Sequence, residues 1–205
     1  MVRLPRVERP AAGLQAPHGH LRVADQAEDV IELEHARDAT ARDDAAMRPD
    51  EMDAMARRVI DGNHYMTLGS VDPDGTPRLS PVYYTPAGYH ALYWVSSPDA
   101  HHSVNVAARP GIQIVIFDSS VPVGAGEAVY LAAEAAEVPE EELGAVVGEA
   151  FRTTAGARPF APDELRGDSD LRLYRARITG CEVHVAGRRR TDGGDIDIRM
   201  PATPG

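Results

Sequence analysis

Two adjacent histidines, His101 and His102, are the residues of this chain that most clearly suggest chemistry. They lie in residues 96–105, SSPDAHHSVN, directly after a hydrophobic run. Paired imidazole rings serve as metal ligands, as a general acid and base, or, when protonated, as the positive wall of an anion site. The segment by itself allows each of these roles, and also allows two histidines that are simply solvated.

The residues around the pair predict a helix. Ser97, Pro98 and Asp99 supply a hydroxyl cap, a proline for the first turn and a carboxylate for the positive end of the helix dipole. The helix should end near Arg109, because Pro110 disfavours helix in the residue before it. An anion site at the start of this helix is the interpretation we favour.

The alternatives fit the sequence less well. Neighbouring helical residues point about 100° apart, so the two rings are poorly placed to chelate one metal ion. The sequence contains no H-x-x-x-H spacing for a metal and no G-x-S-x-G elbow for a nucleophilic serine. We therefore predict no metal site, and an acid–base pair and a solvated pair remain open.

Composition narrows the function classes. The 205 residues carry a net charge of -11, which argues against a general nucleic-acid binder or a binder of anionic membranes. No apolar run approaches the ~18 residues that span a bilayer. The single cysteine, Cys181, cannot form an internal disulfide, so we expect a cytoplasmic protein. No lysine occurs, so any phosphate must be held by arginine, histidine, hydroxyls or backbone N–H groups.

The distribution of aromatic residues predicts the domain boundaries. Every Phe, Trp and Tyr lies between Tyr65 and Tyr174, and large aromatics supply much of a buried core. We therefore expect a poorly ordered extension over 1–48, a folded domain over 49–186 and a loose tail over 187–205. A natural shorter chain would start at Met47.

Short strands dominate the predicted domain. A helix is expected over 47–62, and Asp72-Pro73-Asp74-Gly75 predicts a hairpin turn between two strands. Further strands follow near 89–96, 111–118, 127–138, 171–178 and 181–187, with a helix near 139–151. The pattern indicates a mostly β fold with some α, an antiparallel barrel with peripheral helices.

The ordered motifs resemble a known family. YMTLGSVDPDGTPRLSPVYY, YHALYWVSSPDAHHSVNVAARP, IQIVIFD and AVYLAAEAAEV follow one another as in the pyridoxamine 5'-phosphate oxidase-related proteins of the FMN-binding split-barrel superfamily. The resemblance covers residues 49–186. It implies a six-stranded split barrel, a homodimer and FMN held in a groove between the subunits.

The resemblance also implies a set of cofactor-binding residues. In this family a short polar cluster after the third strand holds the flavin phosphate and leads into a helix with an asparagine. A second strand lines the flavin with its backbone. The positions of this chain that match are Arg78, Ser80, Pro81, Val82, Ser96, Ser97, His101, His102 and Asn105.

The sequence departs from the family pattern at two places. Val104 stands where an arginine is frequent, and residues 179–185 lack the aromatic that often lies near the flavin. We predict an FMN-dependent oxidoreductase acting on a small-molecule substrate, and identify no catalytic residue. A deazaflavin-dependent reductase and a non-enzymatic flavin- or haem-binding dimer are the alternatives. The apolar strand residues Tyr83, Tyr130 and Leu131 add to the expectation of a homodimer.

Overall fold

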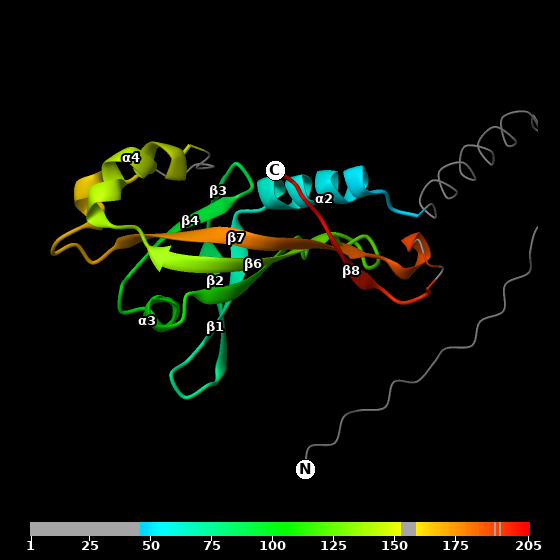
Figure 1. Cartoon of the computed structure of the whole chain (residues 1–205), viewed down its shortest axis with the longest axis horizontal. Helices are drawn as coiled ribbons and strands as arrows, with labels where there is room; N and C mark the ends of the chain where they lie inside the picture. Colours follow the sequence, from blue (N-terminus) through cyan, green and yellow to red (C-terminus); the bar gives the residue numbers. More distant parts are fainter. Residues whose placement is uncertain (1–45, 153–158, 191, 193) are drawn as a thin grey trace, which may run out of the picture. The chain divides into compact units, whose positions relative to one another are not determined.

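An antiparallel sheet of eight strands forms the centre of the fold (Figure 1). The computed structural model describes residues 46–152, 159–190, 192 and 194–205, all within the compact unit Asp43–Gly205. The strands follow the order β2-β1-β5-β6-β7-β4-β3, and β8 pairs with β7. Their bounds are β1 Tyr65–Val71, β2 Pro77–Tyr83, β3 Thr85–Ala87, β4 Ala91–Ser96, β5 Gly111–Phe117, β6 Ala128–Glu137, β7 Arg172–Val185 and β8 Ile198–Pro201.

In the described ranges, three α-helices and two short 3-10 helices accompany this sheet. The helices are α2 Pro49–Gly62, α3 His101–Ala108, α4 Glu140–Ala150, η1 Pro162–Leu165 and η2 Gly187–Arg189. α2 contacts β5, β6 and β7, α3 contacts β1 and β6, and α4 contacts β3 and β4. Figure 1 shows α2 running along β7 and α3 beside the β1–β2 hairpin. None of the helices in the described ranges has the length and apolarity that crossing a bilayer requires.

Local sequence explains the first elements. In α2 the buried positions include Met52, Met55 and Val59, which recur with helical spacing. In β1, buried and more exposed residues alternate, as one covered face of a sheet requires. Gly75 adopts a φ of 91° in the turn to β2, a conformation that glycine reaches without a steric penalty.

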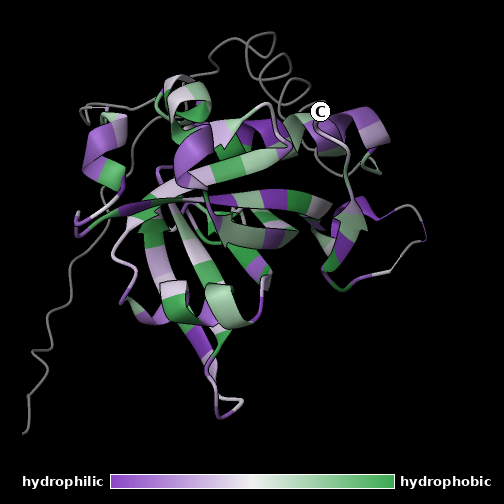
Figure 2. Cartoon of the chain, turned by 60° about the vertical axis from the view of Figure 1, so that its left-hand side comes forward, coloured by the Kyte–Doolittle hydropathy of each residue, from purple (hydrophilic) through white to green (hydrophobic). Residues whose placement is uncertain are grey.

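Two hydrophobic clusters fill the interior. The larger one joins α2 to the central strands, and within it the rings of Trp94 and Tyr174 stack with their centroids 5.4 Å apart. The smaller one lies under α4 and includes Leu143, Leu165 and Leu173. Figure 2 shows hydrophobic and hydrophilic residues alternating along the strands, as these half-covered strands require.

The fold class expected from the sequence is confirmed, with differences in strand number. The structure is a mostly β, antiparallel curled sheet with three α-helices, consistent with a split barrel. The short β3 and the C-terminal β8 raise the strand count from six to eight. The two strands expected around Gly180 are one strand, β7, with a register shift opposite Ala132 and Ala133. A β-bulge bends the strand there without ending it.

Within the segment 187–205, expected to be a loose tail, residues Ile198–Pro201 form the sheet strand β8. β8 pairs with the end of β7, Ala202 is buried, and the backbone N–H of Thr203 donates to Asp53 at 2.6 Å. The alternation in DIDIRM is the strand signal that a boundary drawn at Gly187 overlooked.

Met47, expected in the extension, belongs to the folded core. Its side chain is buried, and its backbone N–H donates to the carbonyl of Arg189 at 2.9 Å. The remainder of the predicted extension, residues 1–45, lies outside the described residues.

One face of the sheet carries exposed uncharged side chains. Tyr65 on β1, Leu79 on β2 and Phe117 on β5 are 64%, 72% and 49% exposed. The strand registers place all three on the same face, together with Tyr83 and Tyr130. Leu131, which we expected to be exposed, instead points into the core and is completely buried.

Candidate functional site

The two histidines lie at the first two positions of α3. The helix begins at His101 and not at Ser97, because residues 97–100 form a turn in which the N–H of Ala100 donates to the carbonyl of Ser97 at 3.2 Å. The hydroxyl of Ser97 accepts from the N–H of Asp99 inside that turn. No side-chain hydrogen bond caps the start of α3. The predicted end before Pro110 is confirmed, since the helix stops at Ala108.

His102 connects α3 to the end of β4. Its Nε2 lies 2.9 Å from the hydroxyl oxygen of Ser96, the last residue of that strand. The pKa of His102 is lowered, first by burial and second by the neighbouring charge of His101. His102 is therefore mainly neutral at neutral pH and contributes a polar ring more than a fixed charge. The ring of His101 is exposed.

Asn105 ties α3 to the β1–β2 hairpin. Its amide nitrogen donates to the hydroxyl of Ser70 at 3.0 Å and to the carboxylate of Asp72 at 2.7 Å. Asp72 also forms an ion pair with Arg78, whose Nε lies 2.8 Å from both carboxylate oxygens. Hydrogen bonds from Arg78 and then Asn105 lower the pKa of Asp72 to about 2. Asp72 is thus a fixed negative charge at this site.

Arg109 adds a second connection between the same elements. Its guanidinium donates to the backbone carbonyls of Val71, Asp72 and Pro73, at 3.2, 2.8 and 3.4 Å. These bonds hold the hairpin turn against the C-terminal end of α3. These hydrogen bonds preorganise a polar cluster. We call this cluster, together with the start of α3, the cradle; its members are Ser70, Asp72, Arg78, Asn105 and Arg109.

The β2 residues predicted to contact the cofactor divide between two faces. Arg78, Ser80 and Val82 share the less exposed side of the strand, whereas Pro81 points to the open face. β2 is an edge strand paired with β1, which agrees with the inability of Pro81 to donate a backbone hydrogen bond. β2 also contacts β4, although the two are far apart in the strand order. The curl of the sheet therefore brings both predicted cofactor strands together.

A hollow of about 510 Å³ opens between the hairpin turn and α3. Its wall includes Asp72, Asp74, Asp99 and His101. Three carboxylates on this wall make the surroundings of the cradle more acidic than the sequence prediction of a histidine-lined anion site implied.

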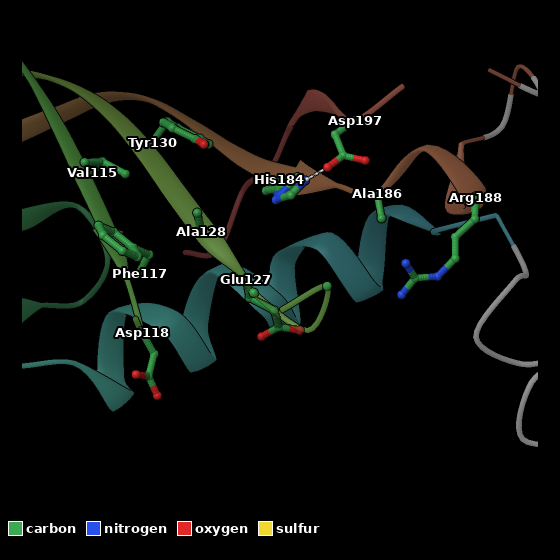
Figure 3. Close-up of a pocket in the computed structure, with 12 residues that line it drawn as sticks. Val115, Phe117, Asp118, Glu127, Ala128, Tyr130, His184, Ala186, Arg188 and Asp197 are labelled. Carbon is green, nitrogen blue, oxygen red and sulfur yellow. Dashed lines mark hydrogen bonds and ion pairs between the residues drawn. The ribbon is translucent and has the colours of Figure 1, made fainter. Parts of the chain in front are cut away.

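A second hollow, of about 470 Å³, lies at the other end of β5 and β6 (Figure 3). Its volume falls in the range of ~300–1,000 Å³ that is typical of small-molecule sites. Phe117 and Tyr130 form apolar walls, and His184 points into it with its Nε2 3.0 Å from Asp197. None of the residues predicted from the sequence to bind the cofactor lines this hollow.

The sequence alone did not identify His184 and Asp197. His184 reads as one more polar residue between the buried Val183 and Val185, and Asp197 lies in the segment taken for a tail. Only the pairing of β8 with β7, which sets His184 opposite Arg199, brings the imidazole and the carboxylate together. The alternation in residues 195–200 indicates a strand but does not say which strand it pairs with.

Two other chemical possibilities are limited by the structure. Cys181 is half-buried, and burial raises the pKa of its thiol to about 11, so it is not a thiolate at neutral pH. In the residues that the structure describes, no three His, Cys, Asp or Glu side chains are grouped as metal ligands would be.

Comparison with solved structures finds the same fold in other proteins. A haem-binding protein from Mycobacterium smegmatis is 24% identical, with a TM-score of 0.54 over 76% of this chain and 60% of that one. A Bacteroides thetaiotaomicron protein whose name links it to 5-nitroimidazole antibiotic resistance is 13% identical, with a TM-score of 0.53 over 62% and 80%. A protein of unknown function from Agrobacterium tumefaciens is 17% identical, with a TM-score of 0.53 over 64% and 55%. At these identities the likeness concerns the fold.

Sequence comparison gives the family. A search among curated proteins finds no match. The family model described as pyridoxamine 5'-phosphate oxidase matches residues 52–184, which include the whole cradle and most of the sheet. The chain therefore belongs to the pyridoxamine 5'-phosphate oxidase-like family of FMN-binding split barrels.

Proposed function

We propose that the protein is an FMN-dependent oxidoreductase that acts on a small-molecule substrate. The observation that carries this proposal is the convergence of β4, α3 and the β1–β2 hairpin on one cradle. There the Ser96–His102 contact, at 2.9 Å, meets the start of a helix without a side-chain cap. Helix starts of this kind present free N–H groups and the positive end of the dipole to an anion.

The predicted residues have distinct tasks in this proposal. The first turn of α3, with Ser97, His101 and His102, would hold the flavin phosphate. The inner side of β2, with Ser80 and Val82, would lie along the ribityl chain and the ring system, and Asn105 would keep the hairpin in place for it. When bound, the flavin supplies the two-electron chemistry, and the protein supplies binding and orientation.

We propose that the working unit is a homodimer formed through the exposed sheet face. Leu79, Tyr65 and Phe117 lie on this face and are uncharged. The cradle and the hollow of Figure 3 lie at opposite ends of β5 and β6 within one chain. A two-fold axis that lies in the plane of the face and runs across β5 and β6 would bring the cradle of one protomer toward the hollow of its partner.

The test of the cofactor is the absorption spectrum of the purified protein, followed by extraction and mass spectrometry. We expect bands close to those of free flavin and a released mass equal to FMN. Release of a deazaflavin would contradict FMN as the cofactor and support the alternative of a deazaflavin-dependent reductase. A colourless protein that does not take up added FMN or deazaflavin would contradict the proposal.

Haem binding without catalysis is a second candidate, and His184 favours it. Asp197 lies 3.0 Å from Nε2 of this ring, so Nδ1 is the ring nitrogen with which His184 would bind an iron in the hollow. A carboxylate that orients an imidazole in this way is common around metal-bound histidines. Added haemin should then give a shifted Soret band that His184→Ala removes. An unchanged haemin spectrum would exclude this candidate.

A further inference from the structure

Asp72 is the residue of the cradle whose position is hardest to reconcile with simple phosphate binding. Its side chain is only 12% exposed, and it stands between the two groups that would otherwise serve an anion. Nε of Arg78 lies 2.8 Å from each carboxylate oxygen, and the amide of Asn105 donates to the same carboxylate at 2.7 Å. Arg78 thus already has an anionic partner within the protein.

The other charges around the cradle do not restore a positive site. Asp74 and Asp99 face the hollow beside Asp72, and His101 is the cation-forming group on that wall. The guanidinium of Arg109 is directed at three backbone carbonyls of the hairpin. Three carboxylates therefore oppose two guanidinium groups, each of which has a partner already.

We propose that Asp72 is a specificity-determining residue of the cofactor site. Its carboxylate pairs with the guanidinium of Arg78, which is then not available to a phosphate. The site therefore disfavours a doubly charged phosphate relative to a ligand that has little or no charge at that position. This inference rests on the proposed flavin site. A fixed like charge a few ångströms from an incoming phosphate opposes binding, more strongly where water is partly excluded. An arginine that forms two parallel hydrogen bonds is a strong protein partner of a phosphate. In this site the guanidinium of Arg78 forms such bonds with the carboxylate of Asp72 instead.

Wild-type protein provides the first measurement. Flavin fluorescence titrations with FMN and riboflavin, which differ only in the phosphate, measure what the phosphate adds to affinity. We expect the affinity for FMN to exceed the affinity for riboflavin by less than about tenfold. In a site without an opposing carboxylate, charge-assisted hydrogen bonds to the phosphate would give a larger ratio. A preference for FMN of a hundredfold or more would overturn the inference without any variant.

Asp72→Asn provides the second measurement. The amide keeps the shape and an acceptor for Asn105 but leaves the charge of Arg78 unopposed. We expect the ratio of FMN to riboflavin affinity to rise roughly tenfold, the scale of one charge-assisted hydrogen bond. Adding Arg78→Ala to this variant should remove the gain, because the gain depends on the freed guanidinium.

Asp74→Asn is the matched control. Asp74 belongs to the same turn and the same hollow, and it accepts a hydrogen bond from the N–H of Thr76 that an asparagine can also accept. We expect its flavin ratio to stay within about twofold of wild type. An equal gain from Asp74→Asn would mean that the general field, and not the pairing with Arg78, sets the preference.

The outcomes separate this inference from the cofactor proposal. If wild type and Asp72→Asn bind both flavins with the same ratio of FMN to riboflavin affinity, the inference about Asp72 is wrong and the proposed flavin site is still supported. If Asp72→Asn changes FMN and riboflavin affinity equally, Asp72 only supports the fold. If neither protein binds either flavin, both proposals are wrong.

Discussion

At the scale of single residues, the contact between His102 and Ser96 is what makes α3 part of a site. The half-buried ring of His102 lies 2.9 Å from a hydroxyl on β4, while His101 is exposed beside it. Two neighbouring histidines that look equivalent in the sequence are therefore different groups in the structure. One is a neutral, positioned ring at neutral pH, and the other is open to a ligand or to solvent.

This difference predicts distinct effects of replacing each histidine. His101→Ala and His102→Ala should both lower the ratio of FMN to riboflavin affinity toward one, because each removes a donor to the phosphate. Riboflavin affinity should stay nearly constant for His101→Ala and should fall for His102→Ala, which also loses the Ser96 contact. Isothermal titration of both flavins with both variants measures this. Equal losses for the two flavins in His101→Ala would place the phosphate elsewhere.

The pH dependence of phosphate binding follows from the lowered pKa of His102. Its positive charge disappears as pH rises through a range below the usual value near ~6.5. The preference for FMN should therefore fall as pH rises through that lower range. The second ionisation of the phosphate, near ~6, changes the charge of the ligand in a neighbouring pH range. Titrations of His102→Ala isolate the contribution of the histidine, since that variant should retain only the part that comes from the phosphate.

Asp72 also predicts how stability depends on acid. Its pKa in the folded protein is about 2, lowered by hydrogen bonds from Arg78 and Asn105, and it is higher in an unfolded chain. A lowered folded-state pKa gives stability that is fully present above about pH 4 and is lost as pH falls toward 2. Asp72→Asn should flatten this part of the pH dependence. Denaturant unfolding between pH 2 and 5 tests it, and an unchanged slope would contradict the ion pair.

At the scale of elements, most of the fold was predictable because its signals are local. Helical spacing of Met52, Met55 and Val59 gave α2, the turn ending in Gly75 gave the first hairpin, and Pro110 gave the end of α3. The start of α3 was misplaced by three residues, because Ser97 accepts a hydrogen bond from Asp99 inside a turn and the helix cap is Ala100.

The pairing of the C-terminal strand with β7 and part of the candidate site could not be predicted in this way. β8 is stabilised by the packing of Ile198 and Met200 against the core beside β7. This contact forms only when the tertiary fold brings the C-terminal segment onto β7. The pairing of Asp72 with Arg78 is likewise a consequence of the hairpin register. The family resemblance made Arg78 a cofactor-binding residue, and the structure pairs it with Asp72.

Removal of β8 is therefore expected to destabilise the protein. A chain ending at Arg190 loses β8, the buried Ala202 and the bond from Thr203 to Asp53. The loss should be about 2–4 kcal/mol, or roughly 5–15 °C in Tm for a domain of this size. Thermal unfolding followed by circular dichroism measures it. A Tm within about 2 °C of wild type would show that the segment is the loose tail that the sequence suggested.

At the scale of the whole molecule, the exposed uncharged sheet face is the feature that a single chain leaves unexplained. Tyr65, Leu79 and Phe117 lie together on it, and the hollow of Figure 3 opens beside Phe117. Apolar patches of this kind are more often interfaces than free surfaces. The proposed homodimer covers them and completes the site from two chains.

A charge placed on this face should separate the protomers. Leu79→Glu adds a carboxylate to the face, where its burial in a dimer would cost several kcal/mol. Ala145→Glu is the control, because Ala145 is exposed on α4, which contacts β3 and β4 at the other end of the strand order from β2. Light scattering should give a dimer for wild type and the control, and a monomer for Leu79→Glu. A wild-type monomer with FMN bound at full occupancy would contradict the shared site.

A crystal structure of the protein grown with FMN would show the proposed cofactor site itself. We expect one flavin per protomer, with its phosphate within hydrogen-bonding distance of the first turn of α3 and its ring system along Ser80 and Val82 of β2. A flavin bound elsewhere, or crystals that exclude FMN at saturating concentration, would contradict it.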